Sequence, residues 1–280
     1  PGYKDVLGQK IKCHKKGGHG SLTFVEGIQQ SCNPVLMTVG LRLGTASFYD
    51  YLKAFGFLER TGIDLPGEGV GVFAAQDAFT DLDLAIYAFG QNFNVTLIQQ
   101  ITAISAVANG GYLVKPHTVS TVTDGSGNVI ESYNTSVRRQ VVSSAVCQTV
   151  ADILEKGVSG NGGAKNAYVA GYRIAAKTGT SEKTDIRDEE GNTYLRIGSC
   201  VAYASADDPQ VACIIICDEP NVENVFGSVT AAPYVAKTMD QVLRYMNIDP
   251  VYSEEELAQM EVTVGGSIIF VQDVVRFEKL

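Results

Sequence analysis

Three strand-like runs in the second half of the chain most constrain its fold. They cover residues 172–178, 194–204 and 210–218, and a short turn at 207–209 joins the last two. Strands joined by so short a turn can pair only in opposite directions, because a parallel pair needs a crossover of about a dozen residues or more. Helices are predicted on both sides of these runs. The sequence therefore predicts an α+β fold, with an antiparallel sheet of about five strands flanked by helices.

Helix-start signals precede the strand-like runs. Thr23 with Glu26, and Thr96 with Gln99, have the spacing of a capping box, in which each side chain bonds the backbone N–H of the other residue. Each pair predicts a helix directly after its threonine, and the second helix is apolar on nearly all sides, which indicates burial. The predicted helices are 24–30, 34–43, 46–55, 81–89, 97–108, 144–156 and 228–246, and two further strands are predicted at 112–122 and 129–133.

Charge and apolar run length exclude two other classes of protein. The 22 basic and 31 acidic residues give a net charge of −9, so we expect no nucleic-acid partner that depends on a broad basic surface. The longest uninterrupted apolar run is 211–217, far short of the roughly 18 residues that a membrane-spanning helix needs. Gly67-x-Gly69-x-Gly71 has neither a strand before it nor a helix directly after it, so a dinucleotide-binding loop is not predicted.

Lys177 is the most distinctive polar residue of the predicted sheet. It follows the apolar run 174–176 and precedes Thr178, Gly179 and Thr180. A lysine on an edge strand can simply protect a sheet from aggregation. The two hydroxyls and the glycine beside it instead favour a ligand-binding site, because they would let a ligand lie close along the strand.

Ser31 and Asn33 form a second polar pair, at a break between two predicted helices. With Cys32 between them, they place a hydroxyl and a carboxamide two residues apart. Serine and asparagine are ordinary helix-capping residues, so the pair by itself favours a capping role.

Taken in order, Ser31-x-Asn33 and Lys177-Thr178-Gly179, which start 146 residues apart, resemble two active-site motifs of the penicillin-binding proteins, the serine D,D-transpeptidases. The resemblance is to the monofunctional, class B type and extends from about residue 17 to residue 246. It implies a β-lactamase/transpeptidase-like fold from which the N-terminal part of the domain is missing. Other similar segments are 18–20, 62–68, 90–99, 108–117, 170–180 and 217–220.

This resemblance implies an acyl-transfer mechanism. In the family, a serine attacks the D-Ala-D-Ala end of a cell-wall stem peptide and forms an acyl-enzyme. An amine on a neighbouring peptidoglycan strand then takes the acyl group from the enzyme. β-Lactams acylate the same serine. By resemblance, Ser31 belongs to the proton-transfer network and Lys177 supplies positive charge to it, so that the proton reaches the leaving nitrogen. Asn33 is expected to hold the amide of the bound peptide.

The resemblance also implies the substrate contacts, the partners and the location. Thr178 and Thr180 are expected to bind the substrate carboxylate beside Gly179, and the Thr180 N–H is expected to form half of an oxyanion hole. The implied partners are stem peptides ending in D-Ala-D-Ala, β-lactams and a membrane glycosyltransferase, and no cofactor is required for catalysis. The implied location is the extracytoplasmic face of the bacterial membrane, with an upstream helix as anchor.

The nucleophile of the family lies in a Ser-x-x-Lys motif, which this sequence lacks. No serine of the chain has a lysine three residues later, so we expect the motif upstream of Pro1 and expect this chain alone to be inactive. Residues 1–248 are then the C-terminal portion of a transpeptidase domain. Residues 249–280 are an extension of unknown role, with a predicted helix at 253–261 and a predicted strand at 268–275.

Two other functions stay open from the sequence. A β-lactamase or β-lactam sensor has the same fold, but the catalytic acid of a hydrolase cannot be placed in this sequence. A non-catalytic scaffold module of a cell-wall synthesis complex would not depend on Lys177.

Cys13, His19 and Cys32 form a third group, with spacings of 6 and 13 residues. These spacings resemble a zinc site of some elongation-type members, in which the fourth ligand precedes the first and would fall before Pro1 here. A tetrahedral structural site needs four ligands. Two alternatives are a Cys13–Cys32 disulfide, which suits an exported protein, and two unlinked thiols beside a surface histidine.

Overall fold

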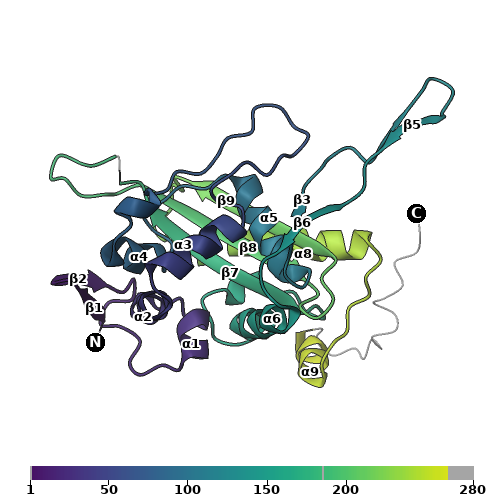
Figure 1. Cartoon of the computed structure of the whole chain (residues 1–280). Helices are drawn as coiled ribbons and strands as arrows, with labels where there is room; N and C mark the ends of the chain where they lie inside the picture. Colours follow the sequence, from purple (N-terminus) through teal and green to yellow (C-terminus); the bar gives the residue numbers. More distant parts are fainter. Residues whose placement is uncertain (1, 185, 264–280) are drawn as a thin grey trace.

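A three-stranded antiparallel sheet lies at the centre of the computed structural model, which describes residues 2–184 and 186–263 (Figure 1). Its strands are β7 (Ile174–Glu182), β8 (Arg196–Ala204) and β9 (Val211–Asp218), and β8 lies in the middle. Lys177 of β7 is opposite Val201 of β8. The three predicted antiparallel runs are therefore confirmed, and β7 continues four residues beyond the predicted end of its run.

The expectation of about five strands in this sheet is wrong for the described part of the chain. The strand predicted at 112–122 is instead divided into β3 (Tyr112–Lys115) and β4 (Thr121–Thr123). β3 pairs with β6 (Ser136–Gln140), which was not predicted, and β4 pairs with β5 (Val129–Ser132), the strand predicted at 129–133. Every residue of β4 and β5 is exposed, so this ribbon has no face that could be buried between helices. In Figure 1 it projects away from the body of the molecule.

Helices cover both faces of the central sheet. On one face, α8 (Ala232–Tyr245) packs its buried side chains against β7, β8 and β9. On the other face lie α5 (Leu97–Ala108) and α6 (Ser144–Ser159). Side chains of a strand alternate between faces, so Ile174 and Ala176 point toward α8 while Ala175 packs with α6. The small alanines allow the helices to approach β7 closely.

The remaining elements precede or follow this core. The structure confirms both predicted capping boxes, at Thr23 and at Thr96. The helix predicted at 228–246 is instead divided in two at Ala231. The other elements are β1 (Tyr3–Val6), β2 (Gln9–Lys12), α1 (Phe24–Gln29), α2 (Asn33–Leu43), α3 (Thr45–Ala54), α4 (Asp81–Tyr87), α7 (Gly227–Thr230), α9 (Glu254–Thr263) and the 3₁₀ turns Gln76–Ala78 and Lys165–Ala167.

The segment after residue 248 is attached next to the start of β7. The Val251 N–H donates to the Gly171 carbonyl at 2.7 Å, and the Gly171 N–H donates to the Glu256 carboxylate at 2.9 Å. The predicted acidic helix is confirmed as α9, whereas the strand predicted at 268–275 lies outside the described residues. None of the helices in residues 2–184 and 186–263 is long and apolar enough to cross a membrane.

Candidate active site

Lys177 and Ser31 are in direct contact. Lys177 Nζ donates a hydrogen bond to Ser31 Oγ at 2.8 Å and another to the carbonyl oxygen of Thr178 at 2.8 Å. Lys177 comes from the middle of β7, and Ser31 comes from the turn between α1 and α2, 146 residues earlier. The two motifs identified in the sequence therefore meet at one place.

Burial changes the acidity of Lys177. Its surroundings lower the pKa of the ammonium group from 10.5 to about 8, mainly by desolvation, and the nearby Cys200 thiol opposes this effect. Because this pKa still lies above neutral pH, the protonated form predominates at pH 7. The group is thus a cation at neutral pH that gives up a proton far more readily than a surface lysine.

Ser31 has an unusual backbone conformation. Its φ angle is 50°, in the left-handed region that non-glycine residues rarely adopt and that costs on the order of 1 kcal/mol. Backbone hydrogen bonds hold the turn: Ser31 N–H donates to Ile28 O at 3.0 Å, and Cys32 N–H donates to Gly27 O at 2.8 Å. This conformation places the hydroxyl within reach of Lys177.

Asn33 does not cap a helix, contrary to the interpretation that the pair favours by itself. Cys32 occupies the N-cap position of α2, which has no side-chain cap hydrogen bond. The Asn33 side chain instead donates to the Lys12 carbonyl at 3.1 Å. It therefore connects the start of α2 to the end of β2.

Of the two threonines near Lys177, Thr180 has its side-chain hydroxyl better oriented to donate a hydrogen bond to a ligand. Its Oγ1 accepts a hydrogen bond from the Gly227 N–H at 3.0 Å, which leaves the hydroxyl proton available to a ligand. A Cβ at Gly227 would overlap the carbonyl oxygens of Gly179 and Ser199, so only glycine permits this approach. Thr178 Oγ1 donates weakly to the Gly163 carbonyl, at 3.4 Å.

Three further residues border this site that no motif identified as functional. The Gly163 N–H donates to Gln29 O at 2.9 Å, so the Gly163 peptide connects α1 to β7. Gln91 hydrogen-bonds the β7 backbone at Thr180. The pKa of His14 is lowered by burial and by the neighbouring His19 and Lys177. Gln91 lies in the similar segment 90–99, but no pattern assigns a role to any of the three residues, because each reaches the site through tertiary contacts.

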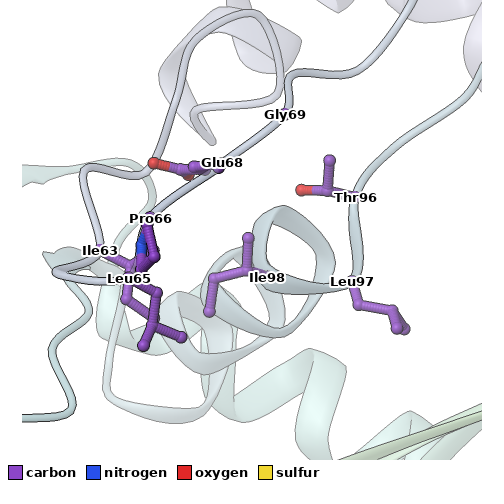
Figure 2. Close-up of a pocket in the computed structure, with 9 residues that line it drawn as sticks. Ile63, Leu65, Pro66, Glu68, Gly69, Thr96, Leu97 and Ile98 are labelled. Atoms are coloured by element: carbon purple, nitrogen blue, oxygen red, sulfur yellow. The ribbon is translucent and has the colours of Figure 1, made fainter.

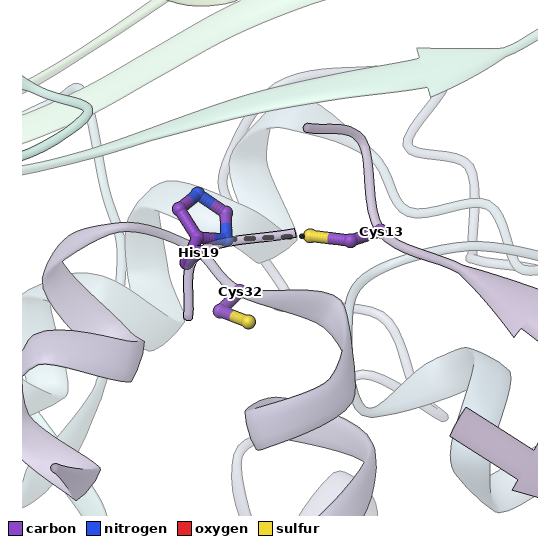
Figure 3. Close-up of side chains that lie close together, drawn as sticks. All are labelled: Cys13, His19 and Cys32. Atoms are coloured by element: carbon purple, nitrogen blue, oxygen red, sulfur yellow. Dashed lines mark hydrogen bonds between the residues drawn. The ribbon is translucent and has the colours of Figure 1, made fainter. Parts of the chain in front are cut away.

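Cys13, His19 and Cys32 come together, as their spacing suggested (Figure 3). Their ligand atoms all lie within 4.8 Å of one another, and Cys13 Sγ lies 3.5 Å from His19 Nδ1. Both thiols are free and buried, so the predicted alternative of a disulfide is not formed. Two thiols and one imidazole are ligands that suit zinc, and together they supply three of the four positions of a tetrahedral site.

A separate hollow of about 330 Å³ lies between the loop after Gly62 and the start of α5 (Figure 2). Leu65, Leu97 and Ile98 make its lining mainly apolar. Its one acidic side chain, Glu68, accepts hydrogen bonds from the Thr61 N–H at 2.6 Å and the Gly62 N–H at 3.0 Å. The Glu68 carboxylate therefore stabilises its own loop through these hydrogen bonds.

Comparison with known protein families gives one clear match. Residues 1–240 match the family described as the penicillin binding protein transpeptidase domain. The chain is 36% identical to the stage V sporulation protein D of Bacillus subtilis over 250 residues, which are 89% of this chain and 38% of that protein. It is 26% identical over 232 residues to the peptidoglycan D,D-transpeptidase FtsI of Escherichia coli K12, covering 83% of this chain and 37% of that protein. The chain thus spans less than half the length of these relatives.

Solved structures show the same fold. The structure of penicillin-binding protein 3 from Mycobacterium tuberculosis in complex with aztreonam is similar with a TM-score of 0.80 and 27% identity, covering 90% of this chain and 58% of that one. The transpeptidase domain of penicillin-binding protein 3 from Burkholderia pseudomallei has a TM-score of 0.76 at 23% identity, over 89% of this chain and 71% of that one. The predicted β-lactamase/transpeptidase-like fold is therefore confirmed.

Replacing Ser31 with glycine or with alanine tests the strained turn. Both variants lose Oγ, but only alanine keeps a Cβ in the left-handed conformation. We expect urea unfolding to show S31G more stable than S31A by about 0.5–1 kcal/mol. Ser47, exposed within α3, is the matched control, because there alanine should be the more stable by about 1 kcal/mol. If alanine were the more stable residue at both positions, Ser31 would not be held in the left-handed region.

Proposed function

The chain belongs to the penicillin-binding protein transpeptidase domain family, and on this basis we propose that it is part of a peptidoglycan D,D-transpeptidase that cross-links stem peptides and binds penicillin. The observation that carries the proposal is the hydrogen bond from Lys177 Nζ to Ser31 Oγ. It unites two motifs that lie far apart in the sequence, in the arrangement that a proton-transfer chain needs.

The proposed reaction starts from a serine in a Ser-x-x-Lys motif outside residues 1–280. Its oxygen bonds to the carbonyl carbon of the penultimate D-alanine, the bond to the terminal D-alanine nitrogen breaks, and that nitrogen takes up the proton the serine loses. In this proposal Ser31 Oγ relays the proton. Lys177, cationic at neutral pH, keeps Ser31 Oγ in place by donating to it. An amine of a second stem peptide then replaces the serine oxygen, which recovers its proton.

The proposed substrate contacts lie along β7. The Thr180 hydroxyl can donate to a ligand carboxylate, since its oxygen already accepts from the Gly227 N–H. Thr178 would assist it, and the Thr180 N–H would stabilise the oxyanion of the tetrahedral intermediate. Asn33 would hold the peptide amide, in a position set by its bond to the Lys12 carbonyl.

The proposed setting is the outer face of the bacterial cell membrane, with a membrane glycosyltransferase as partner. Relatives named for sporulation and for peptidoglycan transpeptidation support a role in cell-wall synthesis. The β-lactam named in the similar structure from M. tuberculosis supports β-lactam binding. The two alternative functions, a β-lactamase and a non-catalytic scaffold module, would give different results when acylation by penicillin is measured.

A structural zinc ion is proposed at Cys13, His19 and Cys32. The support is the donor set itself: two thiols and an imidazole whose ligand atoms lie within 4.8 Å of one another. When bound, zinc would supply folding free energy and take no part in the acyl transfer. Cys32 lies between Ser31 and Asn33, so the site would anchor the segment 13–19 to the start of α2.

Replacing Lys177 with alanine tests the function. In the full-length protein we expect the second-order rate of acylation by a fluorescent penicillin to fall about a hundredfold or more, because the variant loses both the charge and the donor to Ser31. Lys237→Ala, exposed on α8, is the matched control and should be acylated at the normal rate. An unchanged rate in K177A would contradict the role of Lys177. Absence of any penicillin adduct on the unmodified protein would support the scaffold alternative, and rapid deacylation of that protein would identify a β-lactamase.

The pH dependence of acylation gives a second test. The cationic form of Lys177 is the active one in this proposal, so the rate should fall as pH rises through about 8. Stability should change in the opposite direction. The pKa is about 8 in the folded protein against 10.5 ordinarily, so between these values the unfolded state binds more protons and Lys177 contributes increasing stability as pH rises. A rate that stayed constant to pH 9.5, with the fold intact, would contradict the proposal.

Metal analysis tests the zinc site. We expect about one equivalent of zinc in full-length protein purified without chelators, and loss of both metal and thermal stability in Cys13→Ser and His19→Ala. Cys147→Ser, at a buried cysteine of α6, should keep the metal. Metal-free wild-type protein, or full zinc content in C13S, would rule the site out.

A further inference from the structure

The outer edge of β7 points to one further residue with a role at the site. Within the described residues β7 pairs with β8 on one side and with no strand on the other. Alternate residues of a strand direct their backbone groups to the same edge, so Thr178, Thr180 and Glu182 share one edge. Lys177 Nζ bonds the Thr178 carbonyl, and a side chain outside the sheet bonds the Thr180 carbonyl, so this shared edge is the outer one.

That side chain is Gln91. Its Nε2 donates to Thr180 O at 2.9 Å, and its Oε1 accepts a longer hydrogen bond, of 3.4 Å, from the Glu182 N–H. One carboxamide thus makes the donor and acceptor contacts that a neighbouring strand would make. It occupies the edge from the Thr180 carbonyl to the Glu182 N–H and leaves the Thr180 N–H between two occupied carbonyls.

The backbone around Gln91 holds the carboxamide in this place. Gly90 has a φ angle of 89° and Asn92 one of 68°, so Gln91 lies in a tight turn between two left-handed residues. The Gly90 N–H donates to Tyr87 O at 2.9 Å, and the Gln91 N–H donates to Ile86 O at 3.3 Å. The turn is therefore anchored to the end of α4, and the side chain is directed at β7 by the fold.

We propose that Gln91 is a positioning residue for the acyl transfer, acting through Thr180. This inference rests on the proposed function. By donating to the Thr180 carbonyl, Gln91 fixes the orientation of the Thr180–Ser181 peptide group. This peptide group in turn fixes the backbone of β7 at Thr180, and with it the direction of the Thr180 N–H. By closing the edge at Glu182, it also restricts an extended peptide ligand to the stretch beside Thr178 and Thr180.

Two substitutions separate hydrogen bonding from packing. Gln91→Met keeps the length of the side chain and removes both hydrogen bonds. Gln91→Glu keeps an acceptor for the Glu182 N–H but places a carboxylate against the Thr180 carbonyl, where the glutamine has a donor. Gln140→Met, exposed at the end of β6, is the matched control.

The experiment measures turnover of a short D-alanyl thioester by the full-length variants, together with their melting temperatures. We expect kcat to fall about tenfold in Q91M and further in Q91E, with KM changed less than about twofold, because a misdirected oxyanion donor weakens binding of the transition state alone. Melting temperatures should stay close to wild type, and Q140M should match wild type throughout.

Three outcomes would overturn the proposal for Gln91. They are an unchanged kcat in Q91M, a rise in KM without a fall in kcat, and a fall in kcat that parallels a loss of melting temperature. Failure of the proposed function has a different signature, since wild-type protein would then turn over no thioester and form no adduct with penicillin.

Discussion

The contact between Lys177 Nζ and Ser31 Oγ is the interaction on which the site depends. It requires the sheet to place the middle of β7 next to the turn between α1 and α2, 146 residues away in sequence. Alanines in β7 allow helices to pack closely on both of its faces. The turn between α1 and α2 also requires the backbone of Ser31 to stay in the left-handed conformation. Packing around the site offsets two unfavourable contributions to folding free energy. One is the backbone strain at Ser31, and the other is the desolvation of Lys177, whose pKa falls to about 8.

The hydrogen bonds along β7 determine which groups of its outer edge remain available to a ligand. An uncovered edge would accept any extended chain. Here Lys177 occupies one carbonyl and Gln91 the next, while Gly227 approaches close enough to fix the Thr180 hydroxyl. The groups that remain available lie together: the Thr180 N–H, the proton of its hydroxyl, and the Ser31–Lys177 pair. In the proposed function, this arrangement would suit a short anionic peptide end better than a long strand.

Local signals made much of this predictable from the sequence. Capping boxes depend on residues three apart, so Thr23 and Thr96 marked their helices correctly. The motifs around Ser31 and Lys177 predict the family to which the chain belongs. Features set by distant contacts were not predictable. The limit of the described central sheet to three strands, the bond of Asn33 to Lys12 and the bonds of Gln91 to β7 each depend on how separate segments pack.

A double-mutant cycle on Ser31 and Lys177 tests the central claim most directly. The second-order rate of acylation by a fluorescent penicillin would be measured for the wild-type full-length protein, Ser31→Ala, Lys177→Ala and the double variant. If the two side chains act as one unit, the double variant should be about as slow as the slower single variant, a strongly non-additive result. Additive losses, or a Ser31→Ala variant as fast as wild type, would contradict the account.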